Sequence, residues 1–205
     1  MKRALITGGS GAIGQALVRE FSSSYEVFFT YLNNSAAGGI KCDITDRKAV
    51  FDLINNYPHF DLLINNAGIS QIKLFGDITA EDWEKMLAVN LTGAFNVTQA
   101  VLPAMIKRKS GVIVNVSSIW GETGASCEVH YSAAKAGLIG FSKALAKEVE
   151  PSGVKVHYIA PGAVESSMNA GFSAEDLQEA CTFNKGGKIL TPEDVAKEIR
   201  KIAGI

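Results

Sequence analysis

The sequence has little of what marks membrane, secreted or nucleic-acid-binding proteins. Its 205 residues carry a net charge of −1 with no basic block, so neither nucleic acid nor an anionic membrane is an expected partner. No apolar run is long enough to cross a bilayer. The N-terminal apolar segment gives way to glycines too early for a secretory signal.

Cysteine and histidine are also scarce. The three cysteines, Cys42, Cys127 and Cys181, are scattered, which argues against a disulfide framework and favours the reducing cytoplasm as the location. The three histidines are equally scattered, and none of these residues has metal-ligand spacing, so we expect no metal site.

The remaining composition is that of an ordinary globular domain. Hydrophobic residues make up 47% and charged residues 20% of the chain. The chain has neither a composition break nor a repeat, so we predict one domain over residues 1–205.

Short apolar runs alternate with helical patterns along the whole chain. Near-continuous apolar strands separated by helices indicate an α/β fold, a doubly wound parallel sheet with helices on both faces. Helices are predicted over residues 13–21, 80–109 and 131–150 and after Thr191. Only LNNSAAGG separates the second and third strands, so we expect a shortened loop with little or no helix there. The predicted strands are RALIT, EVFFT, GIKC, DLLIN, GVIVNV and KVHYIA.

Two short motifs each allow two interpretations. TGGSGAIG, at residues 7–14, joins the first strand to the first helix, and it is either a tight turn or a loop that cradles phosphates at a helix N-terminus. HYSAAKAG puts Tyr131 and Lys135 on one helical face among small residues. That pattern suits close helix packing, and it also suits a tyrosine whose pKa a nearby lysine lowers for acid–base chemistry.

Further motifs follow in order, each at a strand end or on a helix. Together they resemble the short-chain dehydrogenase/reductase family, and most of all its 3-oxoacyl-carrier-protein reductase group, over nearly the whole chain. The motifs are NNAG at residues 65–68, Asn90 within the first long helix, Ser117 and Ser118 at the end of the fifth strand, YSAAK at 131–135, and Pro161 with Gly162.

The resemblance implies a Rossmann-like sheet of order 3-2-1-4-5-6 and an NADP(H)-dependent oxidoreductase that interconverts a carbonyl and a secondary alcohol, with 3-oxoacyl thioesters of fatty acid biosynthesis as the first substrate to consider. Hydride transfer builds negative charge on the substrate oxygen, so a proton must arrive with it. Tyr131 is then the general acid/base, Lys135 lowers its pKa and binds the cofactor ribose, and Ser118 holds the substrate oxygen. The resemblance assigns Asn90 to a proton relay.

The nucleotide preference is predicted from an absence. Members that prefer NAD carry an acid at the end of the second strand, and here Tyr31 occupies that region, which favours NADP and leaves NAD possible. The usual phosphate-binding arginines are replaced by Gly11 and Leu32, so Asn33, Asn34, Ser35 or Lys41 are alternative contacts. The predicted cofactor-binding residues are Gly8, Ser10, Gly11, Ala12, Ile13, Gly14, Tyr31, Asn33, Asp43, Ile44, Asn66, Ala67, Gly68, Tyr131, Lys135, Pro161, Gly162 and Val164.

The substrate side stays open. A lid is expected over residues 165–188 with a short helix at AEDLQEA, and Lys185 and Lys188 are either contacts for an acidic carrier protein or plain solvated lysines. A homo-oligomer through the two long helices is expected, although Leu138, Phe141 and Leu145 fit core packing equally well. The family's seventh strand has no counterpart before residue 205, so we expect one bare sheet edge. Candidate pocket residues are Trp120, Cys127, His130, Met168 and Phe172.

Two rival functions remain. One is reduction of another small ketone or sugar, because a fold does not determine a substrate. The other is a dinucleotide-binding sensor or scaffold without turnover, which the shortened adenine side of the cofactor site and the missing final strand favour. The complete set of Asn90, Ser118, Tyr131 and Lys135 argues against it.

Overall fold

Six segments form one parallel sheet in the computed structural model, which describes residues 1–34, 36–57, 59–166, 173–184 and 186–204. The order is β3-β2-β1-β4-β5-β6, which confirms the predicted topology. The shortened crossover between β2 and β3 holds no helix among its described residues, also as predicted. The strands are β1 (Lys2–Ile6), β2 (Tyr25–Tyr31), β3 (Ile40–Lys41), β4 (Leu62–Asn65), β5 (Gly111–Val116) and β6 (Val154–Ile159).

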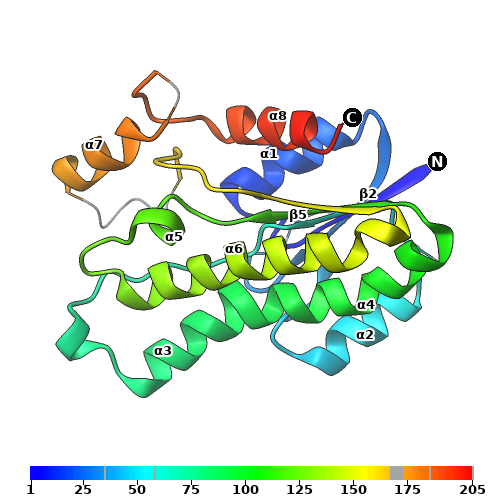
Figure 1. Ribbon diagram of the computed structural model, residues 1–205, viewed down its shortest axis with the longest axis horizontal. Helices are drawn as coiled ribbons and strands as arrows, with labels where there is room; N and C mark the ends of the chain where they lie inside the picture. Colours follow the sequence, from blue (N-terminus) through cyan, green and yellow to red (C-terminus); the bar gives the residue numbers. More distant parts are fainter. Residues whose placement is uncertain (35, 58, 167–172, 185, 205) are drawn as a thin grey trace.

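Helices cover both faces of the sheet. Helices α1 and α8 lie on one face and α2, α4 and α6 on the other, while α5 and α7 gather at one end of the molecule (Figure 1). No helix within the described part of the chain is both long and apolar enough to span a membrane. The helices are α1 (Ala12–Phe21), α2 (Arg47–Asn55), α3 (Ala80–Leu87), α4 (Gly93–Arg108), α5 (Trp120–Thr123), α6 (Val129–Val149), α7 (Ala174–Thr182) and α8 (Pro192–Ile202), with short 3-10 turns at Phe75–Asp77 and Glu150–Ser152.

The strand period explains the two cores. Successive side chains of a strand point to opposite faces. Ile6 and Ile64 accordingly pack with α1 and α8, whereas Leu5 and Leu63 pack with α2, α4 and α6. All four side chains are fully buried, which is why the strands are almost entirely apolar rather than alternating.

The predicted helix over residues 80–109 is interrupted. A π-helical turn, Ala88–Thr92, joins α3 to α4 and carries Asn90. Such turns are rare inserts in α-helices and are frequent at functional sites. The sequence therefore predicted the extent of this helix but not its local geometry.

A chain of buried polar side chains joins the central strands to the helices below them. Asn65 at the end of β4 donates through Nδ2 to Thr98 Oγ1 on α4 at 2.9 Å and to Asn115 Oδ1 on β5 at 2.8 Å. Asn115 Nδ2 donates to Ser142 Oγ on α6 at 2.8 Å, and Ser142 donates to the carbonyl of Leu138 at 2.7 Å. We call these residues the polar ladder. It links β4, β5, α4 and α6 in one register.

Replacing Asn115 with alanine is expected to lower the free energy of unfolding by about 1–3 kcal/mol, because the amides and hydroxyls on either side lose partners in a buried setting. Urea unfolding followed by circular dichroism measures the change.

Gln99→Ala on the exposed face of α4 is the matched control and should change stability by less than about 0.5 kcal/mol. Equal effects from the two variants would show that the ladder contributes no more than an exposed amide.

Candidate active site

Two adjoining cavities open at the carboxyl ends of the strands. The long cleft runs from the glycine loop past the end of β2 to α6, and the lid pocket lies between β5, α6 and α7. Both cavities share a wall made of Ile13, Val116, Ser117, Tyr131 and Ser166. Tyr131 is therefore accessible from two sides.

The glycine loop is both a tight turn and part of the long cleft. Gly8 has φ +67°, and a Cβ on Gly14 would lie 2.1 Å from the Gly8 carbonyl oxygen, so neither position accepts a side chain without rearrangement. Gly11 precedes α1 without a side-chain cap. The first N–H groups of α1 thus have no side-chain acceptor, as an anion site at a helix N-terminus requires.

The β2 end of the long cleft holds no carboxylate among the described residues. Tyr31, Leu32, Asn33 and Asn34 line it, whereas the alternative contact Lys41 does not, and Ser35 lies outside the described residues. Asp43 lines the cleft next to this region and accepts hydrogen bonds from the Thr45 N–H and hydroxyl at 2.9 and 2.7 Å.

Asn90 is buried where the π-turn meets the end of β4. Its Nδ2 donates to the carbonyls of Ile69 and Met86 at 2.9 and 3.1 Å, and its Oδ1 accepts from the Ile69 N–H at 3.2 Å. A Cβ on Gly68 would lie 2.7 Å from Asn90 Oδ1 and 3.4 Å from Lys135 Nζ. The position of the Asn90 amide therefore requires a glycine at 68, whereas the distance to Lys135 Nζ is an ordinary van der Waals contact.

Tyr131 in the shared wall lies between Ser118, which lines the lid pocket, and Lys135, which lines the long cleft. Lys135 Nζ donates to the Val116 carbonyl at 3.0 Å and lies 5.6 Å from the centre of the Tyr131 ring. Ser117 Oγ donates to the Lys135 carbonyl at 2.9 Å, which holds α6 against the end of β5. Ser118 Oγ accepts from the Trp120 N–H at 3.2 Å.

The prediction of a lowered tyrosine pKa is wrong for this arrangement. Burial raises the pKa of Tyr131 well above its ordinary value, the hydrogen bond with Ser118 lowers it, and the charge of Glu128 raises it. Burial also lowers the pKa of Lys135 to about 8. The loss of hydration of the phenolate therefore outweighs the stabilising hydrogen bond from Ser118.

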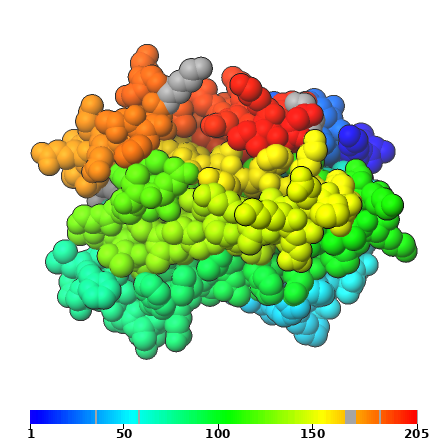
Figure 2. Space-filling model, viewed as in Figure 1, coloured from blue at the N-terminus to red at the C-terminus, as the bar shows by residue number. Residues whose placement is uncertain are grey.

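The lid pocket only partly matches the predicted substrate side. Trp120 lines it, but Cys127 and His130 do not, and Met168 and Phe172 lie outside the described residues. The His130 imidazole is fully buried and its Nε2 hydrogen-bonds Gln71 Oε1 at 2.9 Å. The predicted short helix is present as α7, above α5 at one end of the surface (Figure 2).

Several residues that line the lid pocket were not predicted from the sequence, and three predicted cofactor-binding residues line a different cavity from the one expected. Pro161, Gly162 and Val164 line the lid pocket and not the long cleft to which the resemblance assigned them. Every other predicted cofactor-binding residue does line the long cleft. The lining residues that were not predicted include Ser70, Glu128, Ala163, Asp176, Leu177 and Ala180 in the lid pocket, Thr30, Cys42, Ile69, Lys85 and Val89 in the long cleft, and Val116 and Ser166 in both.

Glu128 stands out among the missed residues. Its side chain is 0% exposed, and neither carboxylate oxygen has a hydrogen-bond partner among the described residues. Burial, followed by the charge of Asp176, raises its pKa to about 7. Its position three residues before Tyr131 was the available signal, but an isolated glutamate carries no pattern.

Known proteins share this architecture. Residues 2–177 match the family model described as short chain dehydrogenase. The chain is 41% identical over 199 residues to the 3-oxoacyl-[acyl-carrier-protein] reductase FabG of Aquifex aeolicus, a match that covers 95% of this chain and 77% of that protein. It is 34% identical over 213 residues to the uncharacterized oxidoreductase YmfI of Bacillus subtilis, covering 95% of this chain and 88% of YmfI.

A solved structure agrees with the sequence matches. The crystal structure of 3-oxoacyl-[acyl-carrier protein] reductase from Brucella melitensis superposes with a TM-score of 0.88 at 31% identity. The match covers 98% of this chain and 84% of that one. The similarity thus extends over nearly the whole of this chain.

Glu128→Gln is expected to stabilise the protein increasingly as the pH rises from 5 to 8. In wild type the folded carboxyl, with a pKa of about 7, keeps a proton that the unfolded chain loses near 4.5, so stability falls as the pH rises through this window. The variant has no carboxyl group at this position and therefore does not lose this free energy of unfolding, which is on the order of 2–3 kcal/mol. Urea unfolding at several pH values measures it.

Glu148→Gln, at an exposed position of the same helix, is the matched control and should show no such trend because its carboxyl is solvated in both states. If the difference in the free energy of unfolding between wild type and Glu128→Gln stays constant between pH 5 and 8, the raised pKa assigned to Glu128 is wrong.

Proposed function

The chain belongs to the short-chain dehydrogenase family, and from that premise we propose that this oxidoreductase reduces a carbonyl to a secondary alcohol with NADPH. The observation that carries the proposal is the convergence of Ser118, Tyr131 and Lys135 at the wall between the long cleft and the lid pocket. A dinucleotide in one cavity and a carbonyl compound in the other would meet there. The bound dinucleotide supplies the hydride.

Tyr131 and the polar side chains on either side of it each have a role in this proposal. Ser118 holds the carbonyl oxygen, and the Tyr131 phenol, kept protonated by burial, donates a proton to it as negative charge develops. Lys135, with a pKa of about 8, exchanges protons readily near neutral pH and is suited to restore the tyrosine proton. Asn90 holds Ile69 and, with it, the wall beside Lys135.

The long cleft suits a dinucleotide along its whole length. The glycine loop and the α1 N-terminus suit the pyrophosphate, Asp43 suits the adenine, and Lys135 suits the ribose. The absence of a carboxylate among Tyr31, Leu32, Asn33 and Asn34 supports NADPH over NADH, since the 2′-phosphate meets no negative charge there.

The relatives' names make a 3-oxoacyl thioester the first substrate to test. Delivery by an acidic carrier protein is part of the proposal for that substrate. Lys188 is exposed beside the lid, whereas Lys185 lies outside the described residues. A sensor without turnover is disfavoured, because a sensor needs no proton donor at the wall between two cavities.

We also propose that the whole chain forms one cytoplasmic domain and that two copies pair through α4 and α6. The exposed face of α6 includes the small residues Ala133, Ala136 and Gly140, and Phe95 on α4 is 40% exposed. Of the predicted interface residues, Leu138 is buried within the subunit and Leu145 packs against its core. Those two fit the core alternative.

Tyr131→Phe is expected to reduce NADPH-dependent turnover of a 3-oxoacyl thioester by roughly 10²-fold or more, because the proton donor is lost. The affinity for NADPH, titrated by tryptophan fluorescence, should change little. Tyr57→Phe, away from both cavities, is the control and should retain turnover. Full activity of Tyr131→Phe would exclude the phenol as proton donor, and binding without turnover in wild type would favour the sensor.

Tyr31→Asp is expected to shift the ratio of NADPH to NADH affinity toward NADH by about tenfold or more, because a carboxylate there repels the 2′-phosphate and accepts from the 2′-hydroxyl. Titration of each nucleotide gives the ratio. Tyr31→Asn separates charge from size, and an equal shift in both variants would exclude the charge effect.

A further inference from the structure

One side of the lid pocket is apolar and lies next to the groups that hold the carbonyl in the proposed function. Trp120, Leu177 and Ala180 line this side, and we call these three residues the apolar wall. The Trp120 N–H donates to Ser118 Oγ at 3.2 Å, so the tryptophan begins directly beside the hydroxyl that holds the carbonyl oxygen. A chain that leaves the carbonyl on this side therefore meets Trp120 after only a few carbon atoms.

The backbone that carries Trp120 is fixed on two sides. The Ile119 N–H donates to the Pro161 carbonyl at 2.9 Å, which ties the start of α5 to the segment after β6. On the other side, a Cβ on Gly121 would lie 2.8 Å from the Lys135 carbonyl carbon, so α5 is seated directly against the backbone of α6. Helix α5 therefore cannot move away from the pocket without disturbing the helix that carries the proton donor.

The indole ring of Trp120 is held as well. The residue is buried, and the ring of Phe183 meets the indole edge-on, at 79° and with the ring centroids 6.3 Å apart. Phe183 is the C-cap of α7 and precedes Asn184. The Asn184 side chain accepts from the Gly162 N–H at 3.1 Å and donates to the Ala163 carbonyl at 2.9 Å. These bonds hold the end of α7 against the tryptophan.

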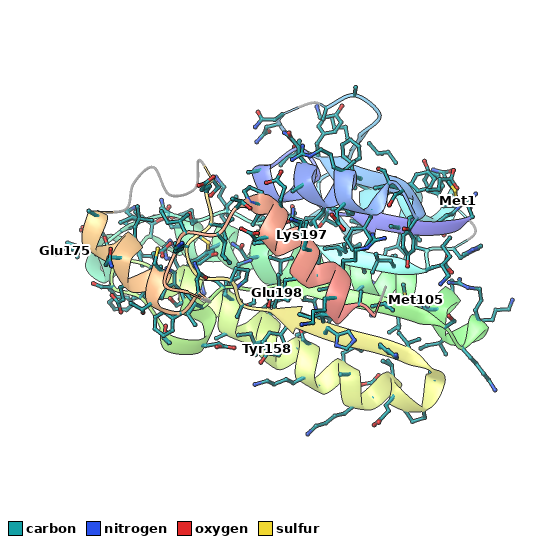
Figure 3. The ribbon with its side chains drawn as sticks, turned by 90° about the horizontal axis from the view of Figure 1, so that it is seen from above. Met1, Met105, Tyr158, Glu175, Lys197 and Glu198 are labelled. Carbon is teal, nitrogen blue, oxygen red and sulfur yellow. The ribbon has the colours of Figure 1, made fainter. Side chains whose placement is uncertain are left out.

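Helix α7 contributes to the apolar wall with its last turns rather than its first. Glu175 lies at the outer end of this helix, far from Met1 (Figure 3). Ala180 and Cys181, by contrast, are buried in the same hydrophobic cluster as Trp120. The apolar wall is thus part of the hydrophobic core formed where α7 meets α5.

The apolar wall can receive only one end of a 3-oxoacyl thioester. The thioester end of a carrier-bound substrate has to leave the pocket toward solvent, so it cannot point into residues that are packed in the core. The alkyl end is apolar and free, and it gains from contact with Trp120 and Leu177. The distance from the carbonyl to Trp120 then limits how long this alkyl end can be.

We propose that Trp120 limits the length of the acyl chain, so that short 3-oxoacyl thioesters such as 3-oxobutanoyl are reduced in preference to long ones. This inference rests on the proposed function, because it takes Ser118 and Tyr131 as the groups that hold the carbonyl. A short alkyl end fills the space beside the indole and displaces water from it. A longer one has to displace side chains packed at the density of a protein interior, which costs more than its added methylenes gain.

The first test measures kcat/KM with NADPH for 3-oxoacyl N-acetylcysteamine thioesters, from 3-oxobutanoyl to 3-oxododecanoyl. Wild type should favour the short end of the series by about tenfold or more. Trp120→Ala should shift the preference toward longer chains by a similar factor, because the smaller side chain leaves space in line with the carbonyl, and Trp120→Leu should shift it part of the way. Trp83→Ala, at an exposed tryptophan of α3 that lines neither described cavity, is the matched control and should keep the wild-type profile.

A second variant keeps the test informative if Trp120→Ala does not fold. Leu177→Ala enlarges the same apolar wall from α7, at a side chain that is only half-buried, and should shift the chain-length preference in the same direction.

The second test does not depend on turnover. Acyl N-acetylcysteamine thioesters without the 3-oxo group, from butanoyl to dodecanoyl, are titrated against the NADP⁺-saturated protein by calorimetry. In an open apolar groove the affinity rises about fourfold with each buried methylene. In wild type this rise should stop after the first few methylenes, and Trp120→Ala should extend it.

The outcomes separate the role of Trp120 from the proposed function. A wild-type kcat/KM that rises steadily to the longest chain, or a profile unchanged in both Trp120→Ala and Leu177→Ala, would overturn the length limit and leave the proposed function intact. A length limit in the binding data without NADPH-dependent reduction of any carbonyl compound would instead overturn the proposed function.

Discussion

The polar ladder is the constraint on which the active-site geometry depends. Asn65 and Asn115 join neighbouring strands where both are fully enclosed, and Ser142 extends the chain to α6. Asn65 directly precedes the residues that line the long cleft at β4, and Ser118 follows Asn115 by three positions. Because buried amides have few alternative partners, a shift in register between these elements leaves donors unsatisfied. The ladder thereby holds Ser118, Tyr131 and Lys135 in one place.

The same enclosure makes the site costly to fold. Tyr131, Lys135 and Glu128 are each at least nine-tenths buried, and for each of them burial is the main cause of the pKa shift. Within the described part of the chain, only the lysine has a hydrogen-bonded backbone partner that stabilises its charge, the Val116 carbonyl. In most proteins the structural preferences of the local sequence agree with the overall fold, and exceptions to this agreement are found mainly at functional sites. Desolvation here keeps a phenol protonated and brings a lysine pKa near neutrality, both of which suit proton transfer.

The sequence predicted those features that repeat along the chain or have a fixed spacing. Apolar strands, the glycine loop and the Tyr131–Lys135 pair are local patterns, and each one has the position expected. The π-turn at Asn90, the direction of the Tyr131 pKa shift and the unpaired Glu128 could not be predicted in that way. Each depends on which residues from distant segments close over a group, and Glu128 is buried partly because α7 lies against the same pocket. Periodicity contains no information about that enclosure.

The division into two cavities explains why the reaction was easier to infer than the substrate. The long cleft and the shared wall are built from the sheet and its first helices, whose sequence patterns define the family and its hydride chemistry. The lid pocket is completed by α7, held through Asn184, which accepts from the Gly162 N–H at 3.1 Å and donates to the Ala163 carbonyl at 2.9 Å. Such connecting segments vary while the scaffold beneath them is retained. Glu128 belongs to both parts, since it directly precedes α6 and lines the lid pocket that α7 completes.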